Sequence, residues 1–395
     1  MAVATISLAS DNGDFVVVSA PDDYFIEDEI ILDTDPKGMY ATGFKIRTQS
    51  GAFEYGGRIV GEKVPIRELV LPFWLNPTSR PRFQRLWGTP GNFRKVRYTY
   101  DGPSGPRSLT LKLSKEIEYQ TEDGFDADID GVYHAVVSAI AVNPNYEGAE
   151  DAAEWVNPDD RFDVTLQDIA SGNWKLTFTP TVGSAATTAN IAYDATSSQV
   201  QTAVTGLSSV GAGNATVTAL PNGHRIVFAS GVNGVLTGTD VSLVGTGLLG
   251  TGKVFAVDYA PNTGWFDVWN PTDQPLWPEW TFDPAEAWEF PDFSFGQERK
   301  WGRTVGEDAG RLIRTPQLTQ LLSVMSDPFM DTYVNADLSN AAGLFNGVEP
   351  VYMVPPYTAT SDDPVLMPVV CYGPAGSKAT LRQRRFWSAE SGLEA

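Results

Sequence analysis

Three aspartates at alternate positions are the sharpest candidate for a metal site in this sequence. Asp126, Asp128 and Asp130 precede the turn residue Gly131, and carboxylates in this arrangement can converge on a hard cation such as Ca²⁺. The twelfth position of such a loop is Val137, where calcium loops carry a bidentate Glu. Apolar residues alternate with the acids, which is also the pattern of a strand with one solvated acidic face. We prefer the strand interpretation and keep the calcium site as the alternative.

Residues for nucleophilic or zinc chemistry are scarce. The chain has two histidines, His134 and His224, and one cysteine, Cys371, in separate parts of the sequence. A zinc site or a His-based triad needs more than this, and no G-x-S-x-G motif is present. We expect His134 to be a satisfied strand residue and His224, after the turn PNG, to be exposed. No carboxylate pair is singled out by its context, so the sequence indicates neither an enzyme nor a cofactor.

Two overlapping glycine motifs imitate nucleotide-binding loops. Residues 245–250 read GTGLLG, but the strand-like segment KVFAVDYA follows, where the dinucleotide fingerprint requires a helix to hold the pyrophosphate. Residues 247–253 match G-x-x-x-x-G-K, yet Val254 stands where a Ser or Thr hydroxyl must reach Mg²⁺. A flexible return loop between domains explains both motifs.

Aromatic residues concentrate between Gly264 and Phe295, which hold five of the eleven tryptophans with five prolines and seven carboxylates. Exposed tryptophans can stack on sugar rings, so Trp265, Trp269 and Trp277 are candidates for carbohydrate binding. The same residues alternate as in strands, and large aromatics dominate the energetics of protein cores. We expect most of these tryptophans to fill a core.

The composition bounds the fold and the partners. The chain has 395 residues, including 37 Gly and 27 Pro, and its Val, Ile, Thr, Tyr and Phe alternate between turns, which predicts two or three mainly β domains. A net charge of −21 argues against specific nucleic-acid binding, because Lys and Arg supply affinity for phosphates. The N-terminus has no basic region and no run of 18 apolar residues occurs, so we expect neither a signal peptide nor a membrane span.

The charge is unevenly distributed. Residues 121–170 hold thirteen acidic residues against one basic residue, while residues 80–115 hold nine basic residues against one acidic residue. Opposite patches on one subunit suit side-to-side self-association, although two solvated faces explain the pattern equally well. If the patches pair, the candidate interface residues are Arg94, Lys95 and Arg97 on one side and Glu122, Asp126 and Asp128 on the other.

The elements that position these residues fall into four segments. Residues 1–147 predict strand after strand, with a hairpin turn at Asp101-Gly102 and one helix at Thr78 to Trp87. Residues 148–170 read as an acidic linker, which ends in a possible first strand, Arg161 to Gln167, of the C-terminal domain.

Residues 171–257 are rich in Gly, Ala, Thr and Ser and predict a small α+β module, with a helix capped by Thr196. Residues 258–395 return to strands. After Thr315 the spacing fits a short helix or a strand, and a last strand ending at Trp387 precedes an expected loose tail.

The order of these segments resembles the siphophage distal tail proteins. In the first segment the resemblance rests on RELVLPFWL, FQRLWG, FRKVRYTYDG with RSLTLKL, and VYHAVVSAIAVNPNY; in the last it rests on FDVWNPTDQPLWPEWTF, VYMVPPYT, VLMPVVCYG and LRQRRFW. It covers about 300 of the 395 residues. The middle segment resembles a small module of phage structural proteins, inserted here as a departure from the simplest members.

The resemblance implies an N-terminal β-sandwich-like tail-tube domain and a C-terminal galectin-like β-sandwich, with the α+β module between them. It also implies a hexameric ring in the virion tail tip, assembled in the host cytoplasm, that joins the tail tube protein to the baseplate hub. The tape measure protein and DNA would pass through this ring. The alternative role is adhesion to host cell-wall carbohydrate, and a cell-wall enzyme would need a cleft with paired acids.

Overall fold

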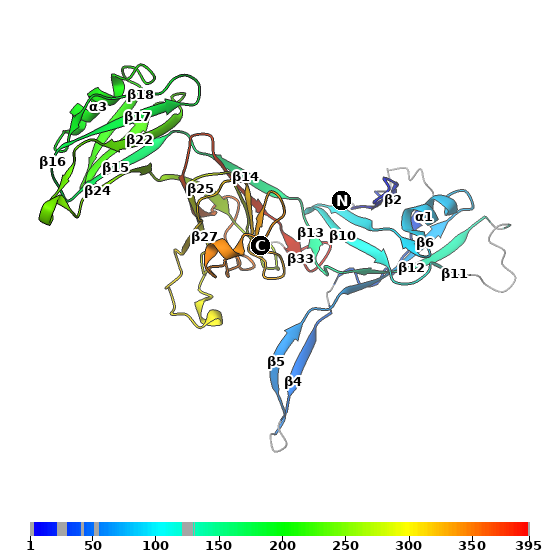
Figure 1. Ribbon diagram of the computed structural model, residues 1–395. Coiled ribbons are helices and arrows are strands. Elements are labelled where there is room, and N and C mark those ends of the chain that lie inside the picture. Colours follow the sequence, from blue (N-terminus) through cyan, green and yellow to red (C-terminus); the bar gives the residue numbers. More distant parts are fainter. Residues whose placement is uncertain are drawn as a thin grey trace.

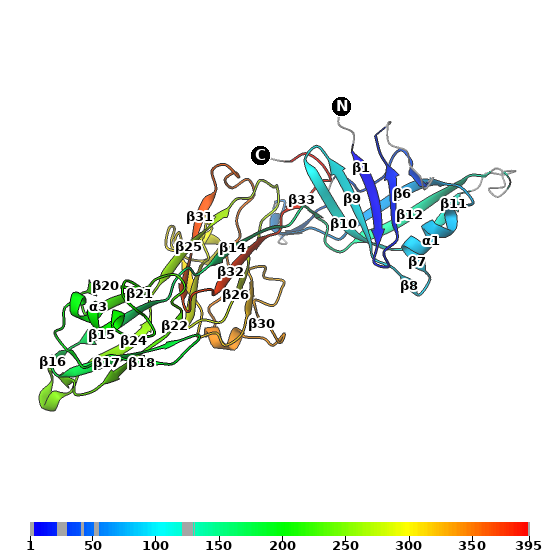
Figure 2. The ribbon, with the colours of Figure 1, turned by 90° about the horizontal axis from the view of Figure 1, so that it is seen from above.

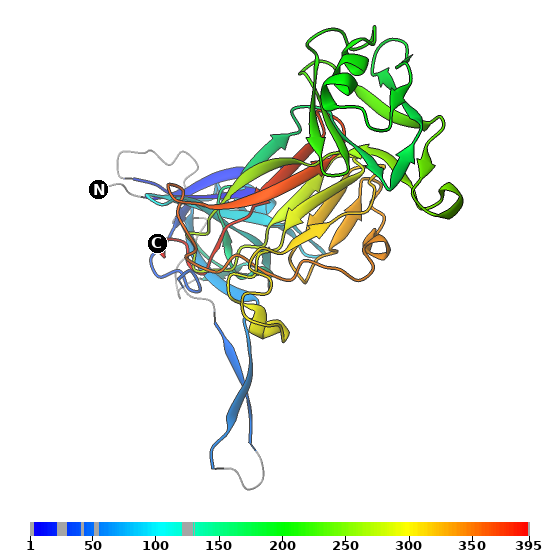
Figure 3. The same cartoon turned by 90° about the vertical axis from the view of Figure 1, so that its left-hand side faces the viewer.

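A computed structural model describes residues 4–21, 30–40, 43–50, 55–120, 129 and 131–393. The fold is mainly β, as predicted, and its buried apolar residues form three separate clusters. The bodies built on these clusters follow one another in Figure 1, with the N-terminal body at the right, a β-sandwich in the middle and the inserted module at the left. A long hairpin projects from the N-terminal body, and in Figure 3 it stands clear of everything else.

The N-terminal body is a strongly curved sheet in the order β2-β1-β9-β10-β12-β6-β3, with β11 beside β12 and β13 beside β10. Its strands are β1 (Thr5–Ser10), β2 (Phe15–Ser19), β3 (Ile30–Leu32), β6 (Arg67–Leu75), β9 (Val96–Gly102), β10 (Gly105–Leu113), β11 (Glu118–Gln120), β12 (Tyr133–Ala141) and β13 (Tyr146–Glu147). A small hairpin, β7 (Gly88–Thr89) and β8 (Asn92–Phe93), follows the helix.

Period-two alternation builds the core of this body. In β6 every second side chain from Leu69 to Leu75 is buried, and β12 alternates in the same way. The predicted helix is confirmed as α1 (Arg80–Trp87), which buries Phe83, Leu86 and Trp87 against the sheet. The predicted β9–β10 hairpin is also confirmed, although Gly102 pairs with Gly105, so its turn is Pro103-Ser104 and lies two residues later than predicted.

Two sheets form the β-sandwich and share one core. The first runs β14-β32-β26-β29-β30 and the second β25-β31-β27-β28. Their bounds are β14 (Asp151–Val156), β25 (Asn262–Val268), β26 (Glu279–Phe282), β27 (Ala287–Pro291), β28 (Leu312–Arg314), β29 (Leu322–Met325), β30 (Tyr333–Asn335), β31 (Val365–Tyr372) and β32 (Lys378–Gln383), with short helices η2 (Glu298–Trp301) and η3 (Ala342–Phe345). After Thr315 the strand alternative is the correct one, because β29 forms where the spacing also fitted a helix.

Part of the segment expected to be a linker is regular structure. All six residues of β14 pair with β32, so this acidic stretch is an edge strand of the sandwich. Its Trp155 packs edge-on against Trp288, with ring centroids 6.2 Å apart. Trp155 also lies over Gly264, where a Cβ would come within 2.4 Å of the indole. Glycine in β25 is therefore what allows the two strands to approach.

The inserted module packs two small sheets and one helix around its own core. One sheet runs β20-β21-β15-β24, and β17 pairs with β18, β19 and β22 in the other. The elements are β15 (Arg161–Gln167), β17 (Asn173–Pro180), β18 (Ala186–Thr187), β19 (Ile191–Ala192), β20 (Ala215–Leu220), β21 (Gly223–Phe228), β22 (Gly234–Asp240), β24 (Val254–Tyr259) and α3 (Ser197–Thr205), with β16 (Ile169–Ser171), β23 (Val244–Gly245) and η1 (Leu248–Gly250) at one end.

The predicted cap of the helix is confirmed. Thr196 accepts a hydrogen bond from the N–H of Gln199, whose side chain in turn accepts from the N–H of Thr196 at 2.8 Å. β15 pairs with β21 and β24, so the segment Arg161–Gln167 is paired within the module rather than in either sheet of the sandwich.

One carboxylate ties the module to the sandwich. Asp160 is 1% exposed, and its two oxygens accept hydrogen bonds from the Gly234 N–H of the module at 2.7 Å and the Ala375 N–H of the sandwich at 2.5 Å. Burial raises the pKa of Asp160. Asp160 is thus hydrogen-bonded to both bodies, and the Tyr259 N–H of the module also donates to Glu286 of the sandwich at 3.2 Å.

The prediction of a loose tail after the last strand is wrong. β33 (Phe386–Trp387) pairs with β13, and in Figure 2 the end of the chain lies along the N-terminal body. Trp387 belongs to the core of that body, and the Tyr98 hydroxyl donates to Glu390 at 2.9 Å. Since Glu390 is buried, its pKa is raised.

Two buried arginines hold this returning segment. Arg107 donates hydrogen bonds to the carbonyl oxygens of Ala389 at 3.0 Å and Gly392 at 2.8 Å, and Arg67 donates to the carbonyl of Ser388. Desolvation lowers the pKa of both guanidinium groups. The segment is held mainly through its backbone, because carbonyl oxygens take up the guanidinium donors.

Candidate subunit interface

The hairpin of β4 (Lys45–Gln49) and β5 (Arg58–Lys63) is the most exposed regular structure in the described part of the chain. Its strands pair only with each other, and they point away from the N-terminal body in Figures 1 and 3. Ile46 is 46% exposed and Ile59 is 63% exposed, and both side chains lie on the same side of the ribbon. An isolated two-stranded hairpin is marginally stable in water, so we expect a partner to cover this one.

The sheet from which the hairpin springs has an apolar outer face. Ile31, Val70 and Trp74 are all more than one-third exposed, and they alternate with core residues on β3 and β6. The open face of an antiparallel sheet is normally polar. Exposed apolar side chains therefore make both this outer face and the hairpin candidate contact surfaces.

His134 lies beside this outer face. The ring is 4.5 Å from that of Trp74, and its nitrogens lie 2.8 Å from Gln120 Oε1 and 3.1 Å from Asp33 Oδ2. A hydrogen bond from the Thr34 N–H is the main cause that holds the pKa of Asp33 below its usual value, and His134 adds to it. His134 is thus a hydrogen-bonded strand residue, as expected.

The three basic candidates for the interface lie at or next to β9. Arg94 Nη1 is 3.5 Å from Asp11 Oδ1, and Lys95 lines a groove of about 360 Å³ between β10 and the segment after β12. Arg97 is exposed on the outer face of β9. Their proposed acidic partners, Glu122, Asp126 and Asp128, lie outside the described residues, so the pairing stays a prediction.

The calcium candidate has the same status, since Asp126, Asp128 and Asp130 all lie outside the described residues. Within the described ranges, no three His, Cys, Asp or Glu side chains are grouped so that they could hold a metal ion. In the same part of the chain, no helix is both long and apolar enough to cross a membrane.

The three tryptophans proposed for carbohydrate differ in their surroundings. Trp265 is 58% exposed on the edge strand β25, whereas Trp269 and Trp277 are half-buried. The guanidinium of Arg385 lies 4.2 Å from the centre of the Trp269 ring and covers it. Of the three, Trp265 is the one with a face open to a sugar.

Groups that could do chemistry elsewhere are engaged in structure. Cys371 is fully buried, which raises the pKa of its thiol. The glycine motif at residues 245–250 contains η1, and β24 follows it, so the predicted strand after the motif is confirmed.

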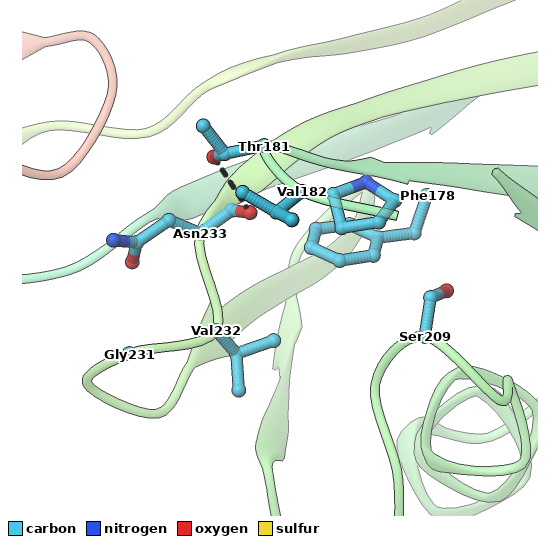
Figure 4. Close-up of a pocket in the computed structure, with 8 residues that line it drawn as sticks. Phe178, Thr181, Val182, Ser209, Gly231, Val232 and Asn233 are labelled. Carbon is cyan, nitrogen blue, oxygen red and sulfur yellow. Dashed lines mark hydrogen bonds between the residues drawn. The ribbon is translucent and has the colours of Figure 1, made fainter. Parts of the chain in front are cut away.

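A cavity of about 400 Å³ opens on the inserted module, and Figure 4 shows its walls. Phe178 lies at its floor, with Val182, Val232 and Ser209 around it. None of the eight residues that line it is charged. Binding sites usually combine an apolar wall with a few convergent polar groups, so this cavity has only part of such a site.

The expectation of an exposed His224 is wrong. The residue is 7% exposed, stacks near Trp174 and lies with Nδ1 at 3.1 Å from Ser197 Oγ. It follows a turn, but its side chain lies against Trp174 of β17 and Ser197 of α3. Burial lowers the pKa of His224.

This burial predicts that the module loses stability in acid. Below about pH 6.5 the unfolded chain takes up a proton at His224 that the folded module resists. The free energy of unfolding therefore falls, by at most about 1.4 kcal/mol for each unit by which the pKa of His224 is lower in the folded module than in the unfolded chain. The variant His224→Gln removes this dependence. Hydrogen exchange of β21 amides between pH 7 and pH 5, corrected for intrinsic rates, measures the opening free energy. Parallel pH dependences in the wild type and the variant would contradict the prediction.

Comparison with known proteins gives matches in structure only. No family model and no curated protein matches the chain. The phage SPP1 Dit (gp 19.1) protein, described as a paradigm of the hub adsorption apparatus in phages that infect Gram-positive hosts, is similar with 10% identity and a TM-score of 0.44, over 96% of this chain and 98% of its own.

Chains of the phage P2 baseplate in its activated conformation, with Ca or with Sr, are similar with 8% identity and a TM-score of 0.36, and again cover 96% of this chain and 98% of their own. With identities of 8–10%, these likenesses do not say which residues form a site.

Proposed function

We propose that this chain is a structural protein of a siphophage tail tip and that its N-terminal bodies associate into a ring. The ring is hexameric, joins the tail tube to the baseplate hub, and lets the tape measure protein and DNA pass. The chain has no catalytic role, acts in the virion tail and is assembled in the host cytoplasm. The sequence motifs of the first and last segments support the family, and the exposed hairpin supports self-association.

The uncovered hairpin is the observation that carries this proposal. A ring of identical subunits requires a heterologous interface, in which one surface of each copy meets a different surface of the next. The hairpin and the apolar outer face are two such surfaces on one body. The basic stretch Arg80 to Lys115 is proposed to meet the acidic Glu122 to Asp130 stretch of the next copy as a further contact. Joint reversal of Arg94, Lys95 and Arg97 to Glu is expected to weaken the assembly at moderate salt.

Polar replacement of the hairpin isoleucines tests the proposal. Burying one isoleucine contributes about 1.5–3 kcal/mol, so Ile46→Ser with Ile59→Ser is expected to weaken each contact at least about 100-fold and to turn rings into monomers. Sedimentation velocity and native mass spectrometry measure this. The control is Val182→Ser, which changes an 89% exposed valine on the inserted module. A wild type that stays monomeric, or a variant that assembles normally, would rule the proposal out.

A second candidate function is carbohydrate binding at Trp265, which the exposure of this one side chain favours. Thr263 and Asp267 flank it on the same side of the edge strand, so an aromatic face lies beside polar groups. Titration of the tryptophan fluorescence with host cell-wall sugars tests it. Saturable quenching that Trp265→Ala abolishes would support adhesion, and no quenching would exclude it.

A further inference from the structure

The two sides of the projecting hairpin differ in charge. Cross-strand partners share a side, and the register places Lys45 opposite Lys63 and Gln49 opposite Arg58. Arg47, two residues after Lys45, lies on that side too. The basic face therefore consists of Lys45, Arg47, Arg58 and Lys63, while Ile46, Ile59 and Glu62 lie on the other side.

The basic face is unfavourable in an isolated chain. Lys45 and Lys63 are directly opposite each other, and like charges in such a pair destabilise a hairpin that is already marginal. All four cations are exposed, and none makes an ion pair with any carboxylate among the described residues. Glu62 faces the apolar side, opposite Ile46. An anionic surface that covers the basic face would relieve this repulsion.

A second copy of the chain can provide such an anionic surface, because the chain has an excess of acidic residues. Each copy carries 49 acidic against 28 basic residues, and four of those basic residues are gathered on this one face. Nucleic acid is another polyanion, but each copy approaches it with a net charge of −21, which repels phosphates. The charge balance thus favours protein over nucleic acid.

We infer that the basic face of the hairpin docks on an acidic surface of a second copy, while its apolar side packs separately. This inference rests on the proposed self-association. It adds that the contact includes ion pairs between the basic face and acidic side chains of the second copy. Complementary charges speed encounter and fix register, and exposed pairs are screened by salt. The assembly should therefore depend on ionic strength through these four residues.

Zero-length cross-linking tests the contact directly. A carbodiimide joins a lysine amine to a carboxylate only when the two touch, and an assembly mixed from ¹⁴N and ¹⁵N copies separates bonds between copies from bonds within one. We expect Lys45 and Lys63 to be joined to Asp or Glu of the other copy. An assembled wild type whose Lys45 and Lys63 form no such bonds would overturn this inference and leave the proposed ring standing, whereas a monomeric wild type would overturn both.

Neutralisation of the basic face gives an independent readout. The variant with Lys45→Gln, Arg47→Gln, Arg58→Gln and Lys63→Gln is expected to assemble about tenfold more weakly at 50 mM salt, and to lose most of the wild-type salt dependence up to about 500 mM. Lys300→Gln, at an exposed position of η2 in the sandwich, serves as the control. An unchanged salt dependence, or protection of Lys45 and Lys63 by duplex DNA instead of by a second copy, would overturn the inference.

Discussion

Replacing Arg107 with alanine is expected to lower the free energy of unfolding of the N-terminal body by about 3–5 kcal/mol. The side chain is 1% exposed, and its guanidinium lies 4.4 Å from the centre of the Trp387 ring. It donates to the carbonyl oxygens of Ala389 and Gly392, and without it the buried Ala389 acceptor has no donor unless water enters. Hydrogen bonds from a charged donor each contribute about 1.5–3 kcal/mol, and the emptied volume adds a cavity cost.

Guanidinium chloride unfolding of the full chain measures this loss. Lys112→Ala on the same strand is the matched control, because its side chain is exposed, and it should change stability by less than about 0.5 kcal/mol. Limited proteolysis adds a structural readout, since cleavage after Phe386 or Trp387 should accelerate only in the Arg107 variant. Equal unfolding midpoints for both variants would show that the returning segment contributes little to the body.

The second large effect is expected in the sandwich, where Trp288→Ala should cost about 3–5 kcal/mol. Trp288 is fully buried between Trp155 and Phe282, with ring centroids 6.2 Å and 5.3 Å away. Its indole N–H donates to the Asp283 carbonyl at 2.9 Å, so truncation removes a hydrogen bond and leaves a large cavity.

Trp265→Ala is the natural control for this variant. Both tryptophans lie in the sheet β25-β31-β27-β28, but Trp265 is 58% exposed and its truncation should stay within about 0.5 kcal/mol. Thermal unfolding of both variants separates the structural role of the aromatic stretch from a binding role. A large loss for Trp265→Ala would mean that this ring packs in the fold and is not available to a sugar.

Local patterns were sufficient to predict several elements. The alternation in RELVLPFWL gives the inward and outward sides of β6, and the helix starting after Thr196 follows from its cap and its apolar spacing. These signals lie within about ten residues of each other. They predict the element without information on the segments that pack against it.

Long-range partners could not be read in this way. The acidic composition of residues 151–156 suggested a linker, but pairing with β32, more than 200 residues later, makes the segment a strand. The end of the chain looked loose because it is polar, yet Arg67 and Arg107 bind its carbonyl oxygens, which every sequence has. His224 was misjudged because its turn predicts exposure, whereas its burial depends on Trp174 and on the helix α3, both distant in the sequence.

The candidate interface was recognised only in part. The clustering of basic residues pointed to Arg94, Lys95 and Arg97, but it missed the hairpin, in which Lys45 and Lys63 stand 18 positions apart. In β4 alone, Lys45 and Arg47 alternate with Ile46, and that was the available signal. The cations come to one side only through the way in which β4 pairs with β5, and this pairing includes a bulge next to Arg47.

The return of the chain's end to its beginning also sets an order of events during synthesis. Trp387 and the backbone of residues 388–392 complete a body whose other strands end at Glu147, so that body waits for roughly 240 further residues to be translated. The module and the sandwich can fold first, while the N-terminal sheet still lacks its last pieces. A nascent or truncated chain therefore lacks the last pieces of the N-terminal body.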